Sequence, residues 1–296
     1  LVLLAIFIFG GESIRGFMQS NSNPNDFPKV TLTAVDGAKA EIYLYGAQVT
    51  SWCPANNEEQ LFLSERAEFC HGTAIRGGIP VCFPQFADEG PLLKHGFARI
   101  SVWKLLRTEQ LGDLAQAVIQ LEDSEATRAI WPHAFIATLT VIVGGPSLRL
   151  EFSVENTGAT SFTFTAALHS YLRVADITTT VVEDLAGSCY RDAVTQVREN
   201  NQIESALRFT GEVDRIYSQI TGPVRVRASE QDITVTSTGF DDVVLWNPGL
   251  TRYAALADMA PTGYQRMVCV GAAAITNLPI VDPGGTWYGT QELRHS

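Results

Sequence analysis

The sequence predicts an all-β protein, a sandwich or barrel that forms a single domain. Apolar and polar residues alternate with a period of two in several segments, turn residues separate these segments at short intervals, and helical periodicity is weak throughout. Many short strands with frequent turns are typical of β-sandwiches and β-barrels. Because the composition does not change after Val30, we expect residues 30–296 to form one domain.

The alternation predicts strands in four places: Leu148–Val154, Ser161–His169, Val224 with Val226, and Ile233 with Val235. In the second of these, one face is apolar, with Phe162, Phe164, Ala166 and Leu168. The opposite face carries Ser161, Thr163, Thr165 and His169, with Ala167 among them. Such a strand has one face buried and one face polar. The only stretches that we expect as helical turns are short ones, such as Glu65–Phe69 and Asn201–Arg208.

The charge balance excludes one large class of partners. The chain has 296 residues, of which 46% are hydrophobic and 18% are charged, and its net charge is −11 without a long run of either sign. Nucleic-acid binding needs a basic face, so DNA and RNA are not expected partners. A small anion is not excluded, because a few local arginines can hold one phosphate.

Cysteine usage indicates a reducing compartment, either the cytoplasm or the interior of an organelle. The five cysteines are scattered, odd in number and without CxxC spacing: Cys53, Cys70, Cys82, Cys189 and Cys269. This pattern favours buried free thiols over a disulfide framework or a zinc site.

The first 29 residues do not look like part of the domain. Leu1–Phe9 is a continuous apolar run, but a bilayer requires about 20 apolar residues. The chain does not begin with Met, so the run can be read as the tail of a signal or anchor segment, or as residues foreign to the natural chain. Asn21–Pro28 is polar and rich in Asn and Pro, as linkers are. A membrane-associated assembly through this run stays an alternative.

Ile75–Phe86, IRGGIPVCFPQF, is the most unusual segment. Gly77 and Gly78 permit positive φ angles and close backbone approach, and the two prolines fix the chain between them. A rigid loop of this kind can point Arg76 in one direction. Arg76 is then either a ligand-binding residue or a structural arginine that bridges backbone carbonyls.

Lys94–Arg99, KHGFAR, places three donors within six residues: Lys94, His95 and Arg99. Such a group suits a phosphate or a hydroxyl-rich ligand. The alternative is a solvated turn that Phe97 anchors in the core.

His169 ends the polar face of its predicted strand. Its neighbours on that face are small, namely Thr163, Thr165 and Ala167, and they leave room for a ligand over the sheet. An imidazole at such a place can act as a general acid near neutral pH, or can be merely solvated.

Together these segments resemble the glucose-6-phosphate 1-epimerase (hexose-6-phosphate mutarotase) family, a branch of the aldose 1-epimerase superfamily. The resemblance runs from about Val30 to Leu293 in order and spacing. Besides the segments above, it is carried by YLYGAQVTSW, LHSYLRVADI, DRIY, LWNP, RMVCV and PGGTWYGTQEL.

The resemblance implies a galactose-mutarotase-like β-supersandwich whose concave sheet face holds the sugar, with no metal or organic cofactor. It implies an isomerase in which a carboxylate takes the proton of the C1 hydroxyl while an acid protonates the ring oxygen. His169 matches the acid, Arg76 and Arg99 match substrate-binding arginines, and Asp214 matches an acidic residue that binds sugar hydroxyls. Lys94 stands where the family has glutamine.

One position departs from the family in a way that concerns catalysis. Directly after Val268–Val270 the family has its base glutamate, and this sequence has Gly271 followed by three alanines. Loss of a general base costs roughly 10²–10⁴ in rate. We therefore expect either a weak enzyme, with a gap of about a side chain's size at Gly271 that water fills, or a catalytically degenerate sugar-binding or structural subunit.

Overall fold

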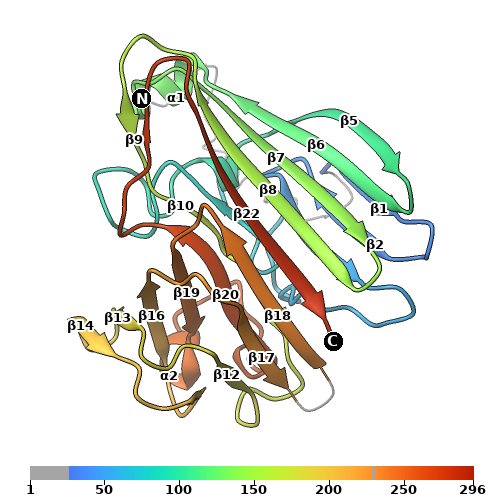
Figure 1. The fold of residues 1–296 in the computed structure, drawn as a ribbon, viewed down its shortest axis with the longest axis vertical. Coiled ribbons are helices and arrows are strands. Elements are labelled where there is room, and N and C mark those ends of the chain that lie inside the picture. The colour runs from blue at the N-terminus through green and yellow to red at the C-terminus, as the bar shows by residue number, and fades with distance from the viewer. Residues whose placement is uncertain (1–26, 229–230) are drawn as a thin grey trace, which may run out of the picture.

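The computed structural model describes residues 27–228 and 231–296 as a single β-sandwich domain with little helix. Figure 1 shows the long strands β5–β8 and β22 side by side in one layer. The shorter strands β16, β19 and β20 lie in a second layer, near helix α2. The predicted fold class, an all-β sandwich, is confirmed.

The larger sheet has nine strands, each antiparallel to its neighbours. In spatial order they are β15 (Ala206–Arg208), β12 (Val181–Glu183), β17 (Val224–Ala228), β18 (Gln231–Thr238), β22 (Thr286–His295), β8 (Ser147–Asn156), β7 (Phe135–Gly144), β6 (Leu114–Glu122) and β5 (Lys104–Leu111).

The second sheet has eight strands and carries the candidate site. Its order is β14 (Val197–Asn201), β13 (Cys189–Asp192), β16 (Val213–Ser218), β19 (Asp242–Asn247), β20 (Met267–Ala274), β10 (Ala166–Leu168) and β4 (Val81–Cys82). β10 and β11 (Tyr171–Arg173) both pair with β20, one after the other along it. The chain bends at His169 and Ser170, which lie between β10 and β11.

The remaining elements are small. β1 (Lys29–Thr33), β2 (Lys39–Tyr43) and β3 (Gln48–Cys53) form a three-stranded sheet, and β9 (Phe162–Thr163) pairs with β21 (Ile280–Val281). The helices are α1 (Glu125–Ile130), α2 (Gly249–Tyr253) and the 3₁₀ turns η2 (Ala98–Ile100) and η3 (Gly263–Arg266). Ser124 caps α1 by accepting from the backbone N–H of Thr127, which is why a helix starts there.

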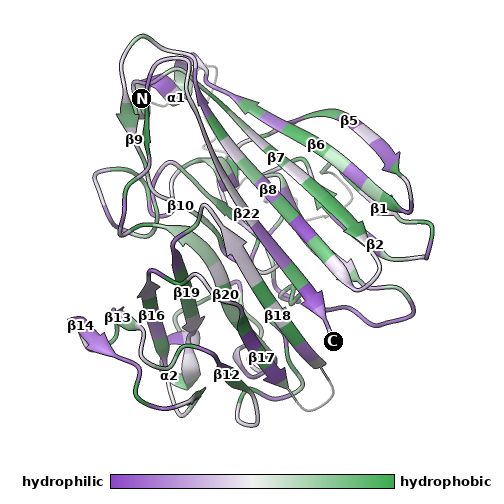
Figure 2. Cartoon of the chain, viewed as in Figure 1, coloured by the Kyte–Doolittle hydropathy of each residue, from purple (hydrophilic) through white to green (hydrophobic). Residues whose placement is uncertain are grey.

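The core lies between the two large sheets. Along β7 and β8 buried and half-buried residues alternate, and Figure 2 shows the matching alternation of hydropathy. Phe83 is fully buried at the centre, with its ring in edge contact with the rings of Phe97, Trp131, Phe135, Phe152 and Phe164. Each fully buried side chain of this kind stabilises the fold by about 1.5–3 kcal/mol.

The predicted strands are confirmed, with one interruption. Leu148–Val154 lies in β8, Val224 and Val226 in β17, and Ile233 and Val235 in β18. Ser161–His169 is divided into β9 and β10, yet its apolar side chains still enter the core and His169 still faces the other way.

The predicted helical turns are wrong. Glu65–Phe69 forms a non-helical turn, and Asn201–Arg208 lies at the end of β14 and in β15. Its residues pair with Cys189 and with Val181–Glu183, and such ladder bonds outweigh the weak preference of so short a segment for a helix. The two α-helices found in residues 27–228 and 231–296 lie elsewhere.

The apolar run Leu1–Phe9 and most of the predicted linker lie outside the described residues. Within 27–228 and 231–296, no helix has the length and apolar character needed to cross a membrane.

Candidate functional site

The six residues singled out in the sequence line one cavity of about 290 Å³: Arg76, Lys94, His95, Arg99, His169 and Asp214. The cavity lies over the face of the eight-stranded sheet that points away from the main core. Val243 and Leu245 of β19 enter that core, whereas Val244 and Trp246 line the cavity. Its volume is near the lower end for small-molecule sites, about 300–1,000 Å³.

Two rows of side chains cross the floor. Strand pairing places Asp214, Trp246, Cys269 and Tyr171 in one row. The next row contains Ile216, Val244 and Gly271, and His169 lies beside Gly271 at the bend between β10 and β11. Neighbouring strands are about 4.8 Å apart, so the backbones of Asp214 and His169 lie on opposite sides of the floor, about 14 Å apart.

Gly271 allows the backbone of the His169 bend to come close to β20. An added Cβ would lie 2.7 Å from the carbonyl oxygen of Leu168 and 3.2 Å from the Cα of His169. The expected water-filled gap of side-chain size is therefore wrong for this position, because backbone atoms occupy the space that the first atom of a side chain would need.

His169 lies among aromatic rings, which lower its basicity by excluding water. The rings of Phe86, Tyr171, Trp246 and His95 lie 5.2–6.2 Å from its own. Burial first, and then the charges of Arg99 and Arg76, lower the pKa of His169 to about 3. Its Nδ1 is buried without a hydrogen-bond partner among the described residues. The imidazole is thus neutral at pH 7 in the unliganded site.

His95 has a defined tautomer. Its Nδ1 accepts a hydrogen bond of 3.1 Å from the backbone N–H of Ala87, so a neutral ring carries its proton on Nε2. Burial, followed by the charge of Arg99, lowers the pKa of His95 far below its usual range. His95 therefore offers one N–H donor and no charge.

The loop that carries Arg76 is held rigid from below. Gly77 and Gly78 have φ angles of 114° and 62°, and a Cβ on either would overlap the carbonyl oxygen of Phe62 or Val49. The buried amide of Gln48 donates to the carbonyls of Ile75 and Gly77, on either side of Arg76. The sequence prediction of positive φ angles and close backbone approach is confirmed.

Arg76 contacts side chains, not backbone carbonyls. Its guanidinium donates to the Asp258 carboxylate and to the Tyr171 hydroxyl, each at 3.0 Å. Tyr171 and Asp258 together raise the pKa of Arg76, which stays charged. Asp258 is consequently committed to this ion pair and does not line the cavity.

The segment 85–99 forms one rim of the cavity. The buried side chain of Gln85 bonds to the backbone of Ala87 and Leu92 and closes the loop. Arg99 donates to the carbonyl oxygen of Lys94 at 2.9 Å, and Lys94 pairs with Asp88 at 3.1 Å. The Lys94–Asp88 pair is exposed, so its contribution to stability is small and a ligand can displace it.

Asp214 is the most perturbed carboxyl group of the cavity. Burial first, and then the nearby charge of Glu212, raise the pKa of Asp214 to about 6. The group is therefore mostly ionised at pH 7 and close to the range in which a general base works best.

The cavity includes residues to which the sequence analysis assigned no role. Tyr171 and Trp246 belong to the LHSYLR and LWNP motifs, and their rings, with that of Phe86, offer flat apolar surfaces. Glu212 and Arg252 also line the cavity, but they stand in segments without a periodic or compositional signal. Strand pairing and loop folding bring these two residues to the site.

Comparisons with known proteins agree with this geometry. The family model described as aldose 1-epimerase matches residues 28–294. A protein of Cenchrus ciliaris, provisionally named a glucose-6-phosphate 1-epimerase, is 36% identical over 283 residues, 92% of this chain and 86% of that protein. A protein of Escherichia coli K12 with the same provisional name is 36% identical over 239 residues, 79% of each chain.

A solved structure is similar throughout. The crystal structure of a provisional mutarotase from Salmonella typhimurium superposes with a TM-score of 0.85 at 29% identity. The similarity covers 93% of this chain and 92% of the Salmonella chain.

Proposed function

Because this chain belongs to the aldose 1-epimerase family, we propose that it interconverts the α and β anomers of a hexose 6-phosphate, at a low rate. The observation that carries the proposal is a single cavity lined by an ionised carboxyl group, a histidine and several cations. The names of the Cenchrus and Escherichia relatives point to glucose 6-phosphate as the first substrate to test.

The cations favour a phosphorylated sugar. Arg76, Lys94 and Arg99 line the cavity together with Arg252, so four cationic side chains and two histidines meet there. Charge-assisted hydrogen bonds to an anion are roughly twice as strong as neutral ones. His95 adds a neutral donor from the same rim.

In the proposed reaction Asp214 is the base and His169 is the acid. Asp214 takes the proton of the C1 hydroxyl while His169 gives a proton to the ring oxygen, and the bond between C1 and that oxygen breaks. The aldehyde rotates about C1–C2, and the reverse transfers close the ring on the other face. A sugar over Val244 and Gly271 would lie between the two groups, with contact at about 3 Å or through one water.

Two features argue for a low rate. The nearest neighbour of His169 across the floor is Gly271, which has no side chain to act as a base. The pKa of His169, about 3, leaves little imidazolium at pH 7. A bound phosphate beside Arg76 and Arg99 would offset two of the causes that lower this pKa, so binding itself favours the protonated acid.

Gly271 also favours a second candidate function, that of a protein that binds a sugar phosphate without catalysis. Exchange NMR of glucose 6-phosphate separates the two, because it measures the rate at which the α and β C1 signals interconvert. The enzyme accelerates this exchange in proportion to its concentration. If the chain binds the sugar phosphate in calorimetry yet leaves the spontaneous rate unchanged, the binding function holds.

The phosphate is tested by the same calorimetry. We expect glucose 6-phosphate to bind at least about tenfold more tightly than glucose, because charge-assisted hydrogen bonds form only with the phosphate. Equal affinities for the two sugars would refute the phosphate assignment while leaving sugar binding intact.

A further inference from the structure

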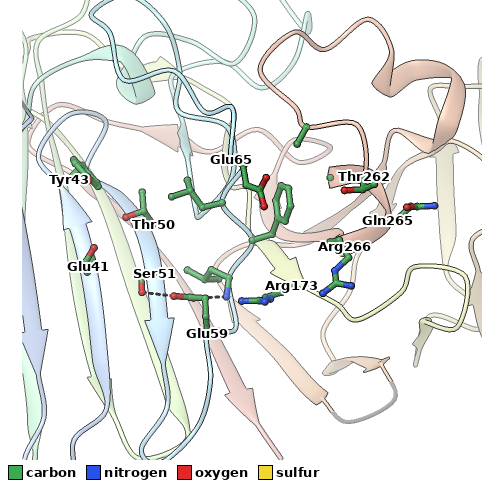
Figure 3. A pocket seen from close by; sticks show the side chains of 15 residues that line it. Glu41, Tyr43, Thr50, Ser51, Glu59, Glu65, Arg173, Thr262, Gln265 and Arg266 are labelled. Carbon is green, nitrogen blue, oxygen red and sulfur yellow. Dashed lines mark hydrogen bonds between the residues drawn. The ribbon is translucent and has the colours of Figure 1, made fainter. Parts of the chain in front are cut away.

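A second cavity, of about 660 Å³, shares no lining residue with the cavity of about 290 Å³ around His169 and Asp214, which we call the sugar cavity. It opens between the hairpin of β2 and β3, the segment 59–65, strand β11 and the segment 260–266 (Figure 3). None of the motif residues assigned above to the sugar line it, so its charges need a separate explanation.

Two arginines stand together at one end of this cavity. Arg173 ends β11 opposite Met267, and the backbone N–H of Val174 donates to the carbonyl oxygen of Arg266 at 3.0 Å, so the two backbones are neighbours. Figure 3 shows both guanidinium groups extending toward the same end. Neither forms an ion pair within the part of the chain that the structure describes.

The carboxylates nearby are already engaged. Glu59 accepts from the backbone N–H groups of Trp52 and Leu61, each at 2.8 Å, and from the Ser51 hydroxyl. Glu41 pairs with Lys29 at 3.0 Å. Asp176, which lies close enough for the charge of Arg266 to contribute to its lowered pKa, accepts two hydrogen bonds of 2.8 Å from Thr178.

Glu65 is the remaining acid of the lining, and Figure 3 shows it away from the arginine end. Two like charges in one cavity repel each other, and a bound anion offsets that repulsion. Thr262 and Gln265, from the same segment as Arg266, add uncharged polar side chains to the lining. Phe62 and Leu63 form an apolar wall that can take a carbon skeleton.

From this arrangement we infer that the second cavity binds a phosphate group between Arg173 and Arg266. Guanidinium groups suit phosphate because each presents a planar fork of donors to two oxygens. The group comes either from free phosphate or from a phosphorylated small molecule whose carbon skeleton lies on Phe62 and Leu63. This inference does not depend on the proposed epimerase activity.

Inorganic phosphate is the probe for the test, and amide resonances of the full chain tell the two cavities apart. Titration is expected to shift the amides of Arg173 and Thr262–Arg266. In the double variant Arg173→Gln with Arg266→Gln, the affinity read from these shifts should fall at least about tenfold, the loss expected for one charge-assisted hydrogen bond. Shifts at Lys94 and Arg99, in the sugar cavity, should persist.

The matched control is the double variant Arg198→Gln with Arg208→Gln. It removes two exposed arginines that form no ion pair within the described residues and line neither cavity. The control should titrate like the wild type. If the amides of 262–266 stay unmoved by phosphate, or move equally in the Arg173/Arg266 variant, the inference is wrong.

Two further measurements refine the site. Glycerol 3-phosphate that binds more tightly than inorganic phosphate would identify a phosphorylated small molecule as the ligand, and equal affinities would identify free phosphate. Glu65→Gln removes one of the negative charges of the lining and should raise the affinity for either probe. A lower affinity in Glu65→Gln would contradict the proposed placement of the anion.

Discussion

At the scale of single residues, Gly271 determines how closely two segments pack. A Cβ here would meet the carbonyl oxygen of Leu168 at 2.7 Å, so Gly271→Ala requires a backbone shift at His169. We expect a loss of about 1–3 kcal/mol in the free energy of unfolding, as for other overpacked sites. Urea denaturation measures it, with Gly222→Ala as control, since nothing lies within 4 Å of a Cβ there. Equal stability of Gly271→Ala and the wild type would contradict the close approach.

The same position can be used to add a base. Gly271→Glu places a carboxyl group one strand away from His169, at the stability cost just described. We expect faster anomer exchange together with lower stability. A variant that binds the sugar phosphate but exchanges no faster would indicate that the bend at His169 had moved out of reach.

Asp214 should set the pH dependence of the activity. Its pKa of about 6 means that the base form is lost as the pH falls through 6, so the exchange rate should decline below this value. Asp214→Asn should lower the rate by roughly 10²–10⁴, the usual contribution of a general base. Asp241→Asn is the control, an exposed aspartate outside the cavity. An unchanged exchange rate in Asp214→Asn would mean that another group acts as the general base.

Much of this site could be predicted from the sequence, because its residues stand in short rigid motifs. The paired glycines Gly77 and Gly78 predicted the loop that carries Arg76, and the small side chains near His169 predicted an open face of the sheet there. The partners could not be predicted, since Asp258 meets Arg76 across 182 positions and Arg252 arrives from a different loop. Gly271 was identified as a missing side chain, but the approach of Leu168 depends on three-dimensional packing that no local pattern reports.

At the scale of elements, the segment after α2 connects the two cavities. Leu256 lines the sugar cavity, Asp258 holds Arg76, and Ala260 to Arg266 form one side of the second cavity. Ser64 fixes the segment from the other side by donating to the carbonyl oxygen of Asp258 at 2.7 Å. The orientation of Arg76 therefore depends on how this segment is placed.

Asp258→Asn tests that dependence. Removing one partner of a largely buried ion pair leaves the Arg76 charge uncompensated, which we expect to cost about 3 kcal/mol in the free energy of unfolding. Saturating glucose 6-phosphate should recover part of the loss, because its phosphate replaces the countercharge. Asp184→Asn, in an exposed pair with Arg225, should cost less than about 1 kcal/mol. A loss in Asp258→Asn no larger than this control would show that Arg76 does not need its partner.

The elements also show where sequence patterns work. Long strands such as β7 and β8 repeat the alternation over ten residues each, so the sequence predicts which of their side chains face the core. Short segments such as Asn201–Arg208 carry too few residues for a period to emerge, and their pairing partners decide their structure. The order of strands within each sheet joins distant parts of the chain and had no local signal.

At the scale of the whole molecule, buried neutral histidines should limit stability in acid. The pKa of His169 is about 3 and that of His95 is also lowered, whereas both are near 6.5 in the unfolded chain. The unfolded state therefore binds more protons below about pH 6.5, and stability falls as the pH drops from there toward 3. The raised pKa of Asp214 opposes this effect only between about pH 6 and 4.

Urea midpoints between pH 7 and 4 measure the effect. His169→Gln should lose stability less steeply on acidification than the wild type. It lacks one of the two histidines that take up a proton in the unfolded chain but not in the folded one. His71→Gln, which removes an exposed histidine outside both cavities, is the control for the loss of a histidine as such. If the urea midpoints of His169→Gln and of the wild type fall equally between pH 7 and 4, His169 is not held neutral by the fold.

The floor of the sugar cavity has a consequence for which sugars the protein accepts. In the middle of the floor Val244 and Gly271 present no polar side-chain atom, so a ring hydroxyl that points down there has no side chain to pair with. The polar groups Asp214 and His169 lie at the two sides of the floor, where the proposed reaction uses them at the C1 hydroxyl and the ring oxygen. A site rejects the wrong isomer strongly only where that isomer leaves a buried hydrogen-bonding group unpaired, and the preference for the right isomer is then about 10⁴–10⁵-fold. Apolar contact alone gives a preference of about 10–200-fold. Mannose 6-phosphate and galactose 6-phosphate should therefore bind within about a hundredfold of glucose 6-phosphate, which competition calorimetry can measure. A breadth of this kind suits a protein that meets mixtures of hexose phosphates rather than one dedicated to a single isomer.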